Sequence, residues 1–341
     1  FLSLFITSFS VSAKIWQVSN VTPTAHFQTL TLAHSQAQPG DTLFVEGSGT
    51  AYEGITLTKK LVLIGPGYFL TENPNTHFNK KPALIKSNVV YEKGSAGSEL
   101  IGFDFRYHGA DVIIWENQIT IKRNRLDVIS FHNNSSSSCS DILIIQNYIE
   151  GEIIGRNPYS YSVLELNRII VSNNFINALN LEQNSQQSSM SGIFENNIIF
   201  GIFLCYNSIV RNNIHLKNST TPSSPGYFLL EKKRFNNVYN NLFALGTPTD
   251  LVNHQVGTNN QFLINKAALF LGLTNNSTDG QWQLLINSPA SKKGSDGSDC
   301  GMFGGATPYQ LSGQPPLPVV YEIIGPDLET GKVTVKARAI N

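Results

Sequence analysis

The sequence predicts an all-β solenoid, in which short strands wind into coils that stack along one axis. Two observations lead to this fold class. The first is an Asn pair that recurs inside apolar runs: "IVSNNFI" (170–176), "IFENNII" (193–199), "IVRNNIH" (209–215) and "NVYNNLF" (237–243). The second is that the runs are short and rich in Ile, Val, Phe and Leu, which is typical of strands, whereas the Asn, Gly and Ser between them indicate turns.

The spacing of the Asn pairs predicts one coil per pair. With two weaker marks included, the second Asn of each pair falls at Asn124, Asn147, Asn174, Asn197, Asn213 and Asn241. Successive marks are 23, 27, 23, 16 and 28 residues apart, and Asn260 adds a further weak mark. Periods of this size are the signature of a repeat architecture, and an insertion in one turn leaves the stack of coils intact.

The recurring Asn has a physical reason in such a stack. A residue at the same phase of successive coils lies directly above its predecessor, so an inward amide can donate to the next coil and satisfy buried polar groups. Asn also tolerates the left-handed backbone that a tight bend requires. We therefore predict a structural ladder at these six positions rather than six catalytic residues.

The two ends of the chain differ from the coils, as the ends of a solenoid must, because an end coil exposes unpaired edges and apolar interior. Residues 1–13, "FLSLFITSFSVSA", match the end of a secretory signal peptide, although a buried first strand is the alternative. We expect an N-terminal cap and entry to the first coil over 14–40, with a short helix within 24–36, and coils over 41–290. The terminal coil and a C-terminal capping tail follow over 291–341, with a hairpin through "GPDLETGK".

Charge and cysteine content narrow the function classes. The chain has 24 basic and 24 acidic residues, so its net charge gives no case for binding nucleic acid or an anionic membrane. No stretch reaches the ~20 apolar residues that a membrane-spanning helix needs. The three cysteines, Cys139, Cys205 and Cys300, are far apart and give neither a disulfide framework nor a CxxC metal site.

Two further stretches, together with the Asn pairs, resemble the right-handed parallel β-helix family, the pectate-lyase-like superfamily. "QPGDTLFVEGSGTAYEGITLTKKLVLIGPG" (38–67) is similar to the first coils of such proteins. "INSPASKKGSDGSDCGMFGG" (286–305) is similar to the ending of many secreted bacterial members. The resemblance covers roughly residues 26 to 305; it implies a right-handed parallel β-helix with a polysaccharide or cell-surface glycan as partner. The N-terminal signal peptide predicts that the protein is secreted or held at the cell surface.

The chemistry that this family uses is not visible as a motif. Neither the paired-Asp motif nor the Gly-His-Gly pattern of its hydrolases is present, so an enzyme would more plausibly be a lyase, acting by elimination on an acidic glycan. Lyases of the family combine acidic Ca²⁺ ligands with an Arg or Lys base, and Ca²⁺ needs several clustered oxygens. The acids here are scattered, "EGE" (150–152) being the nearest to a pair, so no cofactor is evident and Ca²⁺ lacks a ligand cluster.

The longest insertions predict where a binding site would lie. They fall at a similar phase after successive marks, over 132–141, 155–162, 181–190 and 217–227, and should therefore crowd one edge of the stack. Tyrosines offer stacking faces for sugars, and an arginine can bind a carboxylate with two parallel hydrogen bonds. The candidate substrate-binding residues are His132, Arg156, Tyr159, Tyr161, Glu182 and Tyr227, although ordinary solvated loops are the alternative.

Two functions remain open from the sequence. One is a secreted β-helix that binds a polysaccharide or cell-surface glycan and cleaves it by elimination. The other is a non-catalytic adhesion or structural module with a rigid solenoid as spacer. An ice-binding solenoid is disfavoured, because "TLT" occurs only near the N-terminus and not on successive coils.

Overall fold

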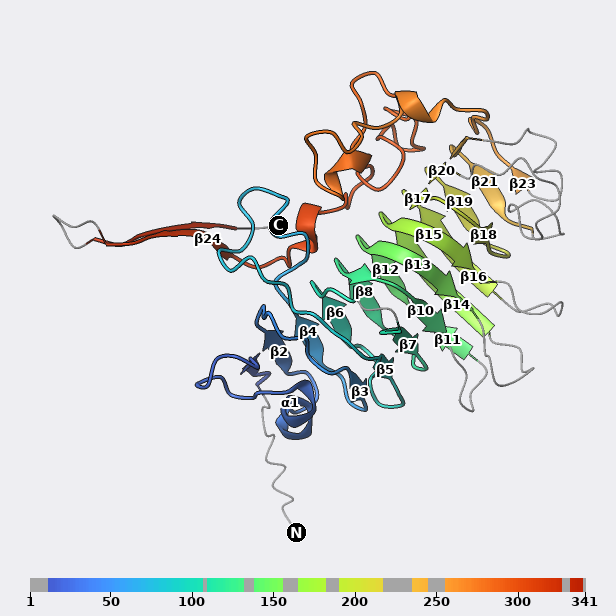
Figure 1. The fold of residues 1–341 in the computed structure, drawn as a ribbon. Coiled ribbons are helices and arrows are strands. Elements are labelled where there is room, and N and C mark those ends of the chain that lie inside the picture. The colour runs from blue at the N-terminus through green and yellow to red at the C-terminus, as the bar shows by residue number, and fades with distance from the viewer. Residues whose placement is uncertain are drawn as a thin grey trace, which may run out of the picture.

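A computed structural model shows a mostly β protein built on a parallel β-solenoid of about eight turns, with a C-terminal antiparallel hairpin (Figure 1). The structure describes residues 12–106, 109–131, 138–155, 165–181, 190–216, 235–244, 255–326 and 332–339. The predicted fold class is thus confirmed. None of the helices in these ranges is long and apolar enough to span a membrane.

Two parallel sheets, here named sheets I and II, form the walls of the solenoid. Each coil contributes short segments to both sheets, and strands from successive coils pair in parallel. Sheet I contains β1 (Ile15–Val18), β2 (Thr42–Val45), β4 (Val62–Ile64), β6 (Glu99–Ile101), β8 (Thr120–Lys122), β11 (Ser138–Ser140), β12 (Leu143–Ile145), β14 (Glu165–Ser172), β16 (Met190–Glu195), β19 (Ile209–Arg211), β21 (Asn237–Tyr239) and β23 (Gln255–Val256). Sheet II contains β3 (Ile55–Leu57), β5 (Val89–Tyr91), β7 (Val112–Ile114), β9 (Arg125–Leu126), β10 (Ile129–Phe131), β13 (Tyr148–Ile154), β15 (Phe175–Asn180), β17 (Ile198–Ile199), β18 (Phe203–Leu204), β20 (Ile214–His215) and β22 (Leu242–Phe243).

The interior of the solenoid is filled by aliphatic and aromatic side chains from both sheets, and several strands contribute two of them, as Val112 and Ile114 do in β7. In sheet I the inward row includes Ile121, Ile144, Val171, Phe194 and Val210, all fully buried. Side chains alternate between the two faces of a strand, so the residues on either side of this row point outward. Burial of a core on this scale is what the short Ile- and Val-rich runs predicted.

The N-terminal end is closed by a short helix and a buried carboxylate. Helix α1 (Leu30–Gln36) begins after Thr29, whose side chain accepts a hydrogen bond from the Leu32 amide, and buries Leu30 and Ala33. Asp41 accepts hydrogen bonds from the amides of Lys14 and Gln38 and from the Trp16 indole, each at 2.8 Å. The expected helix before the first coil is therefore present; residues 1–11 of the predicted signal peptide lie outside the described ranges.

The predicted Asn ladder is present and runs through the turn that joins sheet I to sheet II. The side-chain oxygen of Asn174 accepts from the backbone N–H of Asn147 at 2.8 Å and from its amide nitrogen at 3.0 Å. The same two kinds of hydrogen bond join every successive pair from Asn124 to Asn241 and continue to Asn260. The backbone N–H donates at 2.8 to 3.0 Å and the side-chain nitrogen at 3.0 to 3.2 Å. The six predicted members are buried, so the ladder satisfies polar groups that would otherwise be stranded inside the solenoid.

The residue before each ladder Asn adopts the left-handed backbone. The φ angles are +56° at Arg123, +59° at Gln146, +56° at Asn173, +52° at Asn196, +58° at Asn212, +54° at Asn240 and +67° at Asn259. The two properties that the sequence suggested for one Asn, ladder bonding and left-handed geometry, are thus divided between the two members of the pair.

Residues 264–318, here named the strap, run back along the outside of the solenoid from its last coils toward its first. The strap contains three short 3₁₀ segments, η2 (Lys266–Ala268), η3 (Gly280–Trp282) and η4 (Leu311–Gly313). In Figure 1 it is the orange and red chain above the labelled strands. Its apolar side chains, among them Leu269, Cys300, Met302 and Tyr309, pack on an outward row of sheet II formed by Tyr148, Phe175, Ile198, Ile214 and Leu242.

The left-handed residues of the turn hold the strap. Asn240 donates to the Lys293 carbonyl at 2.9 Å, and the Asn212 side-chain oxygen accepts from the Ser295 amide at 2.8 Å. Asn173 donates to the carbonyls of Met302 and Gly304, Gln146 to those of Thr307 and Pro308, and Arg123 to that of Gln314. From its N-terminal to its C-terminal end, the strap therefore contacts the coils in the reverse of their order in the chain. Most of these coils bind it through one polar side chain.

The strap ends in the hairpin that the sequence predicted. Strands β24 (Val319–Ile324) and β25 (Thr334–Arg338) pair antiparallel, and the ribbon projects from the N-terminal half of the molecule (Figure 1). Its contact with the solenoid side includes a hydrogen bond from the Phe78 amide to the Val320 carbonyl at 2.9 Å.

Candidate functional site

The six candidate residues from the sequence, His132, Arg156, Tyr159, Tyr161, Glu182 and Tyr227, all lie outside the described residues. The structure does describe the strand ends from which their loops leave and to which they return, here named the loop anchors. Each loop leaves the end of a sheet II strand, β10, β13, β15 or β20, and the chain re-enters sheet I at β11, β14, β16 or β21. The anchors therefore share one corner of the solenoid, as the similar phase of the insertions predicted.

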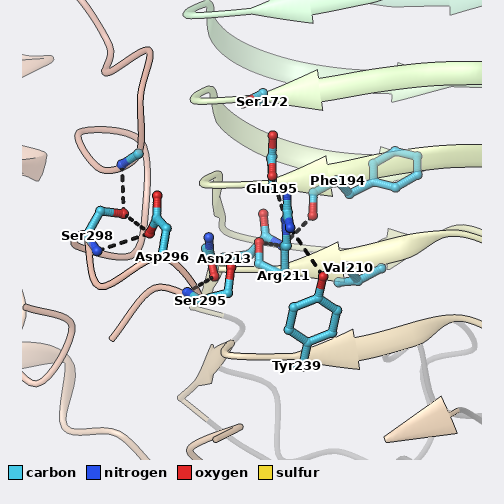
Figure 2. Close-up of polar contacts among 12 residues, drawn as sticks. Ser172, Phe194, Glu195, Val210, Arg211, Asn213, Tyr239, Ser295, Asp296 and Ser298 are labelled. Atoms are coloured by element: carbon cyan, nitrogen blue, oxygen red, sulfur yellow. Dashed lines mark hydrogen bonds and ion pairs between the residues drawn. The ribbon is translucent and has the colours of Figure 1, made fainter. Parts of the chain in front are cut away.

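A different surface of the described chain gathers charged and aromatic groups. Glu195, Arg211 and Tyr239 are the last residues of β16, β19 and β21. They lie directly opposite one another in the parallel pairing of these strands. They are on the outward face, since the preceding residues Phe194 and Val210 point into the core. Figure 2 shows the three side chains on successive strands.

Arg211 is the centre of this row. Its Nε donates to Glu195 Oε2 at 2.7 Å and its Nη1 to the Tyr239 hydroxyl at 3.3 Å. Burial alone would lower the pKa of the Arg211 guanidinium, but its hydrogen bonds to Glu195 and Tyr239 outweigh burial and raise that pKa. The arginine is therefore a fixed positive charge, about one third exposed, beside a phenol ring.

The strap passes next to this row and adds a carboxylate. Asn212 and Asn240, which follow Arg211 and Tyr239, bind the strap at Ser295 and Lys293. Beyond Ser295, Asp296 accepts hydrogen bonds from the Ser298 hydroxyl at 2.6 Å and from its amide at 3.0 Å, and these bonds lower the pKa of the Asp296 carboxyl (Figure 2). Arg211 contributes in the same direction. The stretch "SDGSD" is thus a turn of the strap.

On the other side of the row lies an aliphatic stripe. It is formed by the outward residues two positions earlier in the strands, Leu143, Ile170, Ile193 and Ile209, which are opposite one another in successive coils. Ile170 is 36% exposed, and the other three are partly exposed. The candidate surface therefore consists of Glu195, Arg211 and Tyr239, between the aliphatic stripe and the Asp296 turn of the strap.

A second arginine cluster lies on sheet II. Arg125 makes two hydrogen bonds to Glu150, at 2.8 and 3.0 Å, and approaches the fully buried Asp104 to 3.8 Å. Burial would lower the pKa of Arg125, but the bonds to Glu150 and the charge of Asp104 raise it. Its guanidinium also lies 4.9 Å from the centre of the Phe69 ring. The Arg125 charge compensates the buried carboxylate of Asp104, so this cluster serves the stability of the fold.

The remaining reactive side chains give no metal or thiol centre in the described ranges. The structure shows no group of three or more His, Cys, Asp or Glu residues there that could hold a metal ion. All three cysteines are buried, and burial raises the pKa of Cys139 and of Cys300 to about 12. The Cys205 side chain is fully buried as well.

Sequence reasoning missed the candidate surface, although its signal was present. Glu195, Arg211 and Tyr239 each stand directly before an Asn pair, in "ENN", "RNN" and "YNN". Because they hold the same position relative to the ladder Asn, they lie above one another in successive coils, whereas the long insertions predicted a site on the loops.

Comparisons of this chain with protein-family models, with curated proteins and with solved structures gave no match.

Proposed function

We propose that this protein binds an acidic polysaccharide on the outer face of sheet I, at the surface formed by Glu195, Arg211 and Tyr239. The single observation that carries the proposal is the half-buried Arg211, held between a carboxylate and a phenol on a rigid stack of strands. Functional groups on strands are positioned more firmly than groups on loops, which favours a binding site there.

The chemistry of the row suits a sugar with a carboxylate. A guanidinium has five N–H donors in a planar fork, and the described part of the chain engages Nε and Nη1 of Arg211 with Glu195 and Tyr239. The other donors can meet a uronate carboxylate, while the Tyr239 ring offers a face for stacking. The aliphatic stripe beside the row suits the C–H face of a sugar ring.

Binding is better supported than cleavage. Elimination needs a base whose pKa is lowered, and the pKa of both Arg211 and Arg125 is raised. Burial, and then the charge of Arg123, lower the pKa of Lys122, which lies in the same outward row as Arg211. Four strand spacings separate the two residues, about 19 Å at the usual spacing, so they do not act on the same sugar unit.

In this proposal the protein is secreted or held at the cell surface and is related to the pectate-lyase-like superfamily. A secreted or cell-surface solenoid that holds a glycan without cutting it is the adhesion module of the two functions that the sequence left open. The N-terminal apolar segment and the resemblance of residues 38–67 and 286–305 support this setting.

The test is a binding measurement with a matched pair of variants. Isothermal titration calorimetry with polygalacturonate, alginate and neutral dextran should show binding of the two acidic polymers only. Arg211→Ala should weaken that binding at least about tenfold, which corresponds to ~1.4 kcal/mol. Arg168→Ala is the control, because Arg168 is an exposed arginine of the same sheet paired with Asp141.

Three outcomes would contradict the proposal: equal binding of dextran, an unchanged affinity in Arg211→Ala, or an equal loss in both variants. Absorbance from new unsaturated ends, followed in the same samples, separates binding from elimination. A rise that Lys122→Ala abolishes would replace the binding proposal by a lyase.

A further inference from the structure

The outward row of sheet I that contains Glu195 and Arg211 continues toward the first coils. In successive strands, the residues that lie opposite one another are Lys122, Ile145, Ser172, Glu195, Arg211 and Tyr239. Lys122 and Arg211 are the cations of this series, and four strand spacings, about 19 Å, separate them. Charges at fixed positions on a rigid stack can select a ligand by the spacing of its own charges.

The part of the row between the two cations offers little to a carboxylate. Ile145 and Ser172 are buried and uncharged, and the Ser172 hydroxyl donates to the Asn173 side chain at 2.7 Å. The strap that binds these coils is neutral as well, because residues 300–318 contain no Asp, Glu, Lys or Arg. A carboxylate held against these positions would lose water without gaining a charged partner.

Carboxylates of the protein flank Arg211. Glu195 Oε2 accepts from its Nε at 2.7 Å, and Asp296 of the strap lies near enough for its charge to interact with the guanidinium (Figure 2). A ligand carboxylate on the sugar next to the one at Arg211, toward the earlier coils, would face Glu195. Like charges placed against each other disfavour a ligand. The exposed Lys293 lies in the opposite direction, where the strap binds Asn240, so it does not relieve this repulsion.

Lys122, at the other end of the series, makes no ion pair with another described residue. Its side chain is partly exposed. Burial and then the charge of Arg123 lower the pKa of Lys122, whereas Glu99 acts in the opposite direction. The carboxylate of a ligand would therefore supply a close counter-ion that the described part of the chain does not provide.

We propose that the acidic polysaccharide of this surface carries widely spaced carboxylates, on about every fourth sugar, so that one binds Arg211 and the next binds Lys122. A sugar in an extended chain advances by about one strand spacing, so four sugars cover the distance between the two cations. A polyuronate, with a carboxylate on each sugar, instead sets charges against Glu195 and against the neutral positions. This inference rests on the proposed glycan function and names the class of glycan within it.

Fragments of deacylated gellan test the spacing, because the uronate of gellan recurs once in each tetrasaccharide repeat. In isothermal titration calorimetry, a two-repeat fragment should bind about tenfold more tightly than a polygalacturonate fragment with the same number of sugars. Lys122→Ala should weaken binding of the two-repeat fragment about tenfold but that of a one-repeat fragment by less than about twofold, because only the longer fragment reaches both cations. Lys60→Ala is the control, because Lys60 is an exposed lysine outside the row.

Glu195→Gln tests the repulsion separately. It should strengthen binding of the polygalacturonate fragment about tenfold and that of the two-repeat fragment by less than about threefold, because only the former places a carboxylate against Glu195. Circular dichroism of each variant verifies that it is folded.

The spacing inference and the proposed function fail in different ways. Equal or tighter binding of the polygalacturonate fragment, an unchanged affinity for the two-repeat fragment in Lys122→Ala, or an equal effect of Glu195→Gln on both fragments would overturn the spacing inference. In each of these cases the proposed function stands if Arg211→Ala still weakens binding. If no acidic fragment binds more tightly than dextran, the proposed function fails and the spacing inference fails with it.

Discussion

The two asparagines of each pair can be compared directly, because they are neighbours in sequence with the same side chain. Asn174 points into the solenoid and bonds the coils before and after it. Asn173 has a left-handed backbone, points outward and donates to the Met302 and Gly304 carbonyls of the strap. One local motif therefore stabilises two unlike assemblies: the stack of coils and the attachment of the strap.

Because of this division, the loss of a ladder Asn and the loss of a strap-binding Asn should affect different parts of the molecule. A ladder residue is bonded on both sides along the stack, so its loss strands groups in two neighbouring coils. A strap residue is bonded to one passing segment, whose loss affects that segment first. Substitutions at the two positions should therefore differ both in size and in the region that responds.

The largest effect is expected at the ladder. Asn174→Ala removes the acceptor for the Asn147 amide and the donor to Ile144, Ser172 and Asn197. Because several buried groups lose their partners, we expect the free energy of unfolding to fall by about 3 to 5 kcal/mol. Urea unfolding measures this, with the exposed Asn237→Ala as the control. Equal effects of the two substitutions would show that the ladder adds no stability.

An intermediate effect is expected at the strap. Asn173→Gly keeps the left-handed backbone and removes the bonds to Met302 and Gly304, so it should cost about 1 to 2 kcal/mol. The strap near residues 302–306 should become open to limited proteolysis while the coils stay resistant. Asn173→Ala should cost about 1 kcal/mol more than the glycine variant, because φ is +56° there. Proteolysis that spreads at once through the coils would contradict the division of roles.

The smallest effect is expected where the left-handed residue is exposed. Asn259 has φ +67° and an exposed side chain. Asn259→Gly should change the free energy of unfolding by less than about 0.5 kcal/mol. Asn259→Ala should lower it by about 1 kcal/mol through backbone strain alone. Thermal unfolding of both variants against the unmodified chain isolates the conformational part of the Asn173 effect, and a large loss in the glycine variant would refute this interpretation.

The solenoid could be predicted in some detail, because its signals are periodic and local. Six ladder positions, the strand-rich runs, the helix before the first coil and the terminal hairpin all follow from residue patterns that repeat or that lie within a few residues. The common corner of the long insertions follows as well, since it depends on their phase in the coil.

The candidate surface could be predicted only in part. Glu195, Arg211 and Tyr239 share the phase of the ladder, so their stacking is implicit in "ENN", "RNN" and "YNN". The approach of Asp296 depends on the path of the strap, which crosses the coils about 85 residues after Arg211 in the chain. No local pattern encodes a contact between segments so far apart.

The coils, the Asn ladder and the terminal hairpin follow from residue patterns alone, because residues at the same phase of successive repeats become neighbours when the coils stack. Three features emerge only in the folded molecule: which Asn of each pair faces inward, the return of the strap along the side of the solenoid, and the hydrogen bonds of Arg211 to both Glu195 and Tyr239. The path of the strap depends on the packing of its apolar side chains, among them Met302 and Tyr309, in one cluster with Tyr148 and Phe175 of sheet II. Packing between segments far apart in the chain depends on how their side chains fit together and become buried. A single repeating motif does not specify that fit.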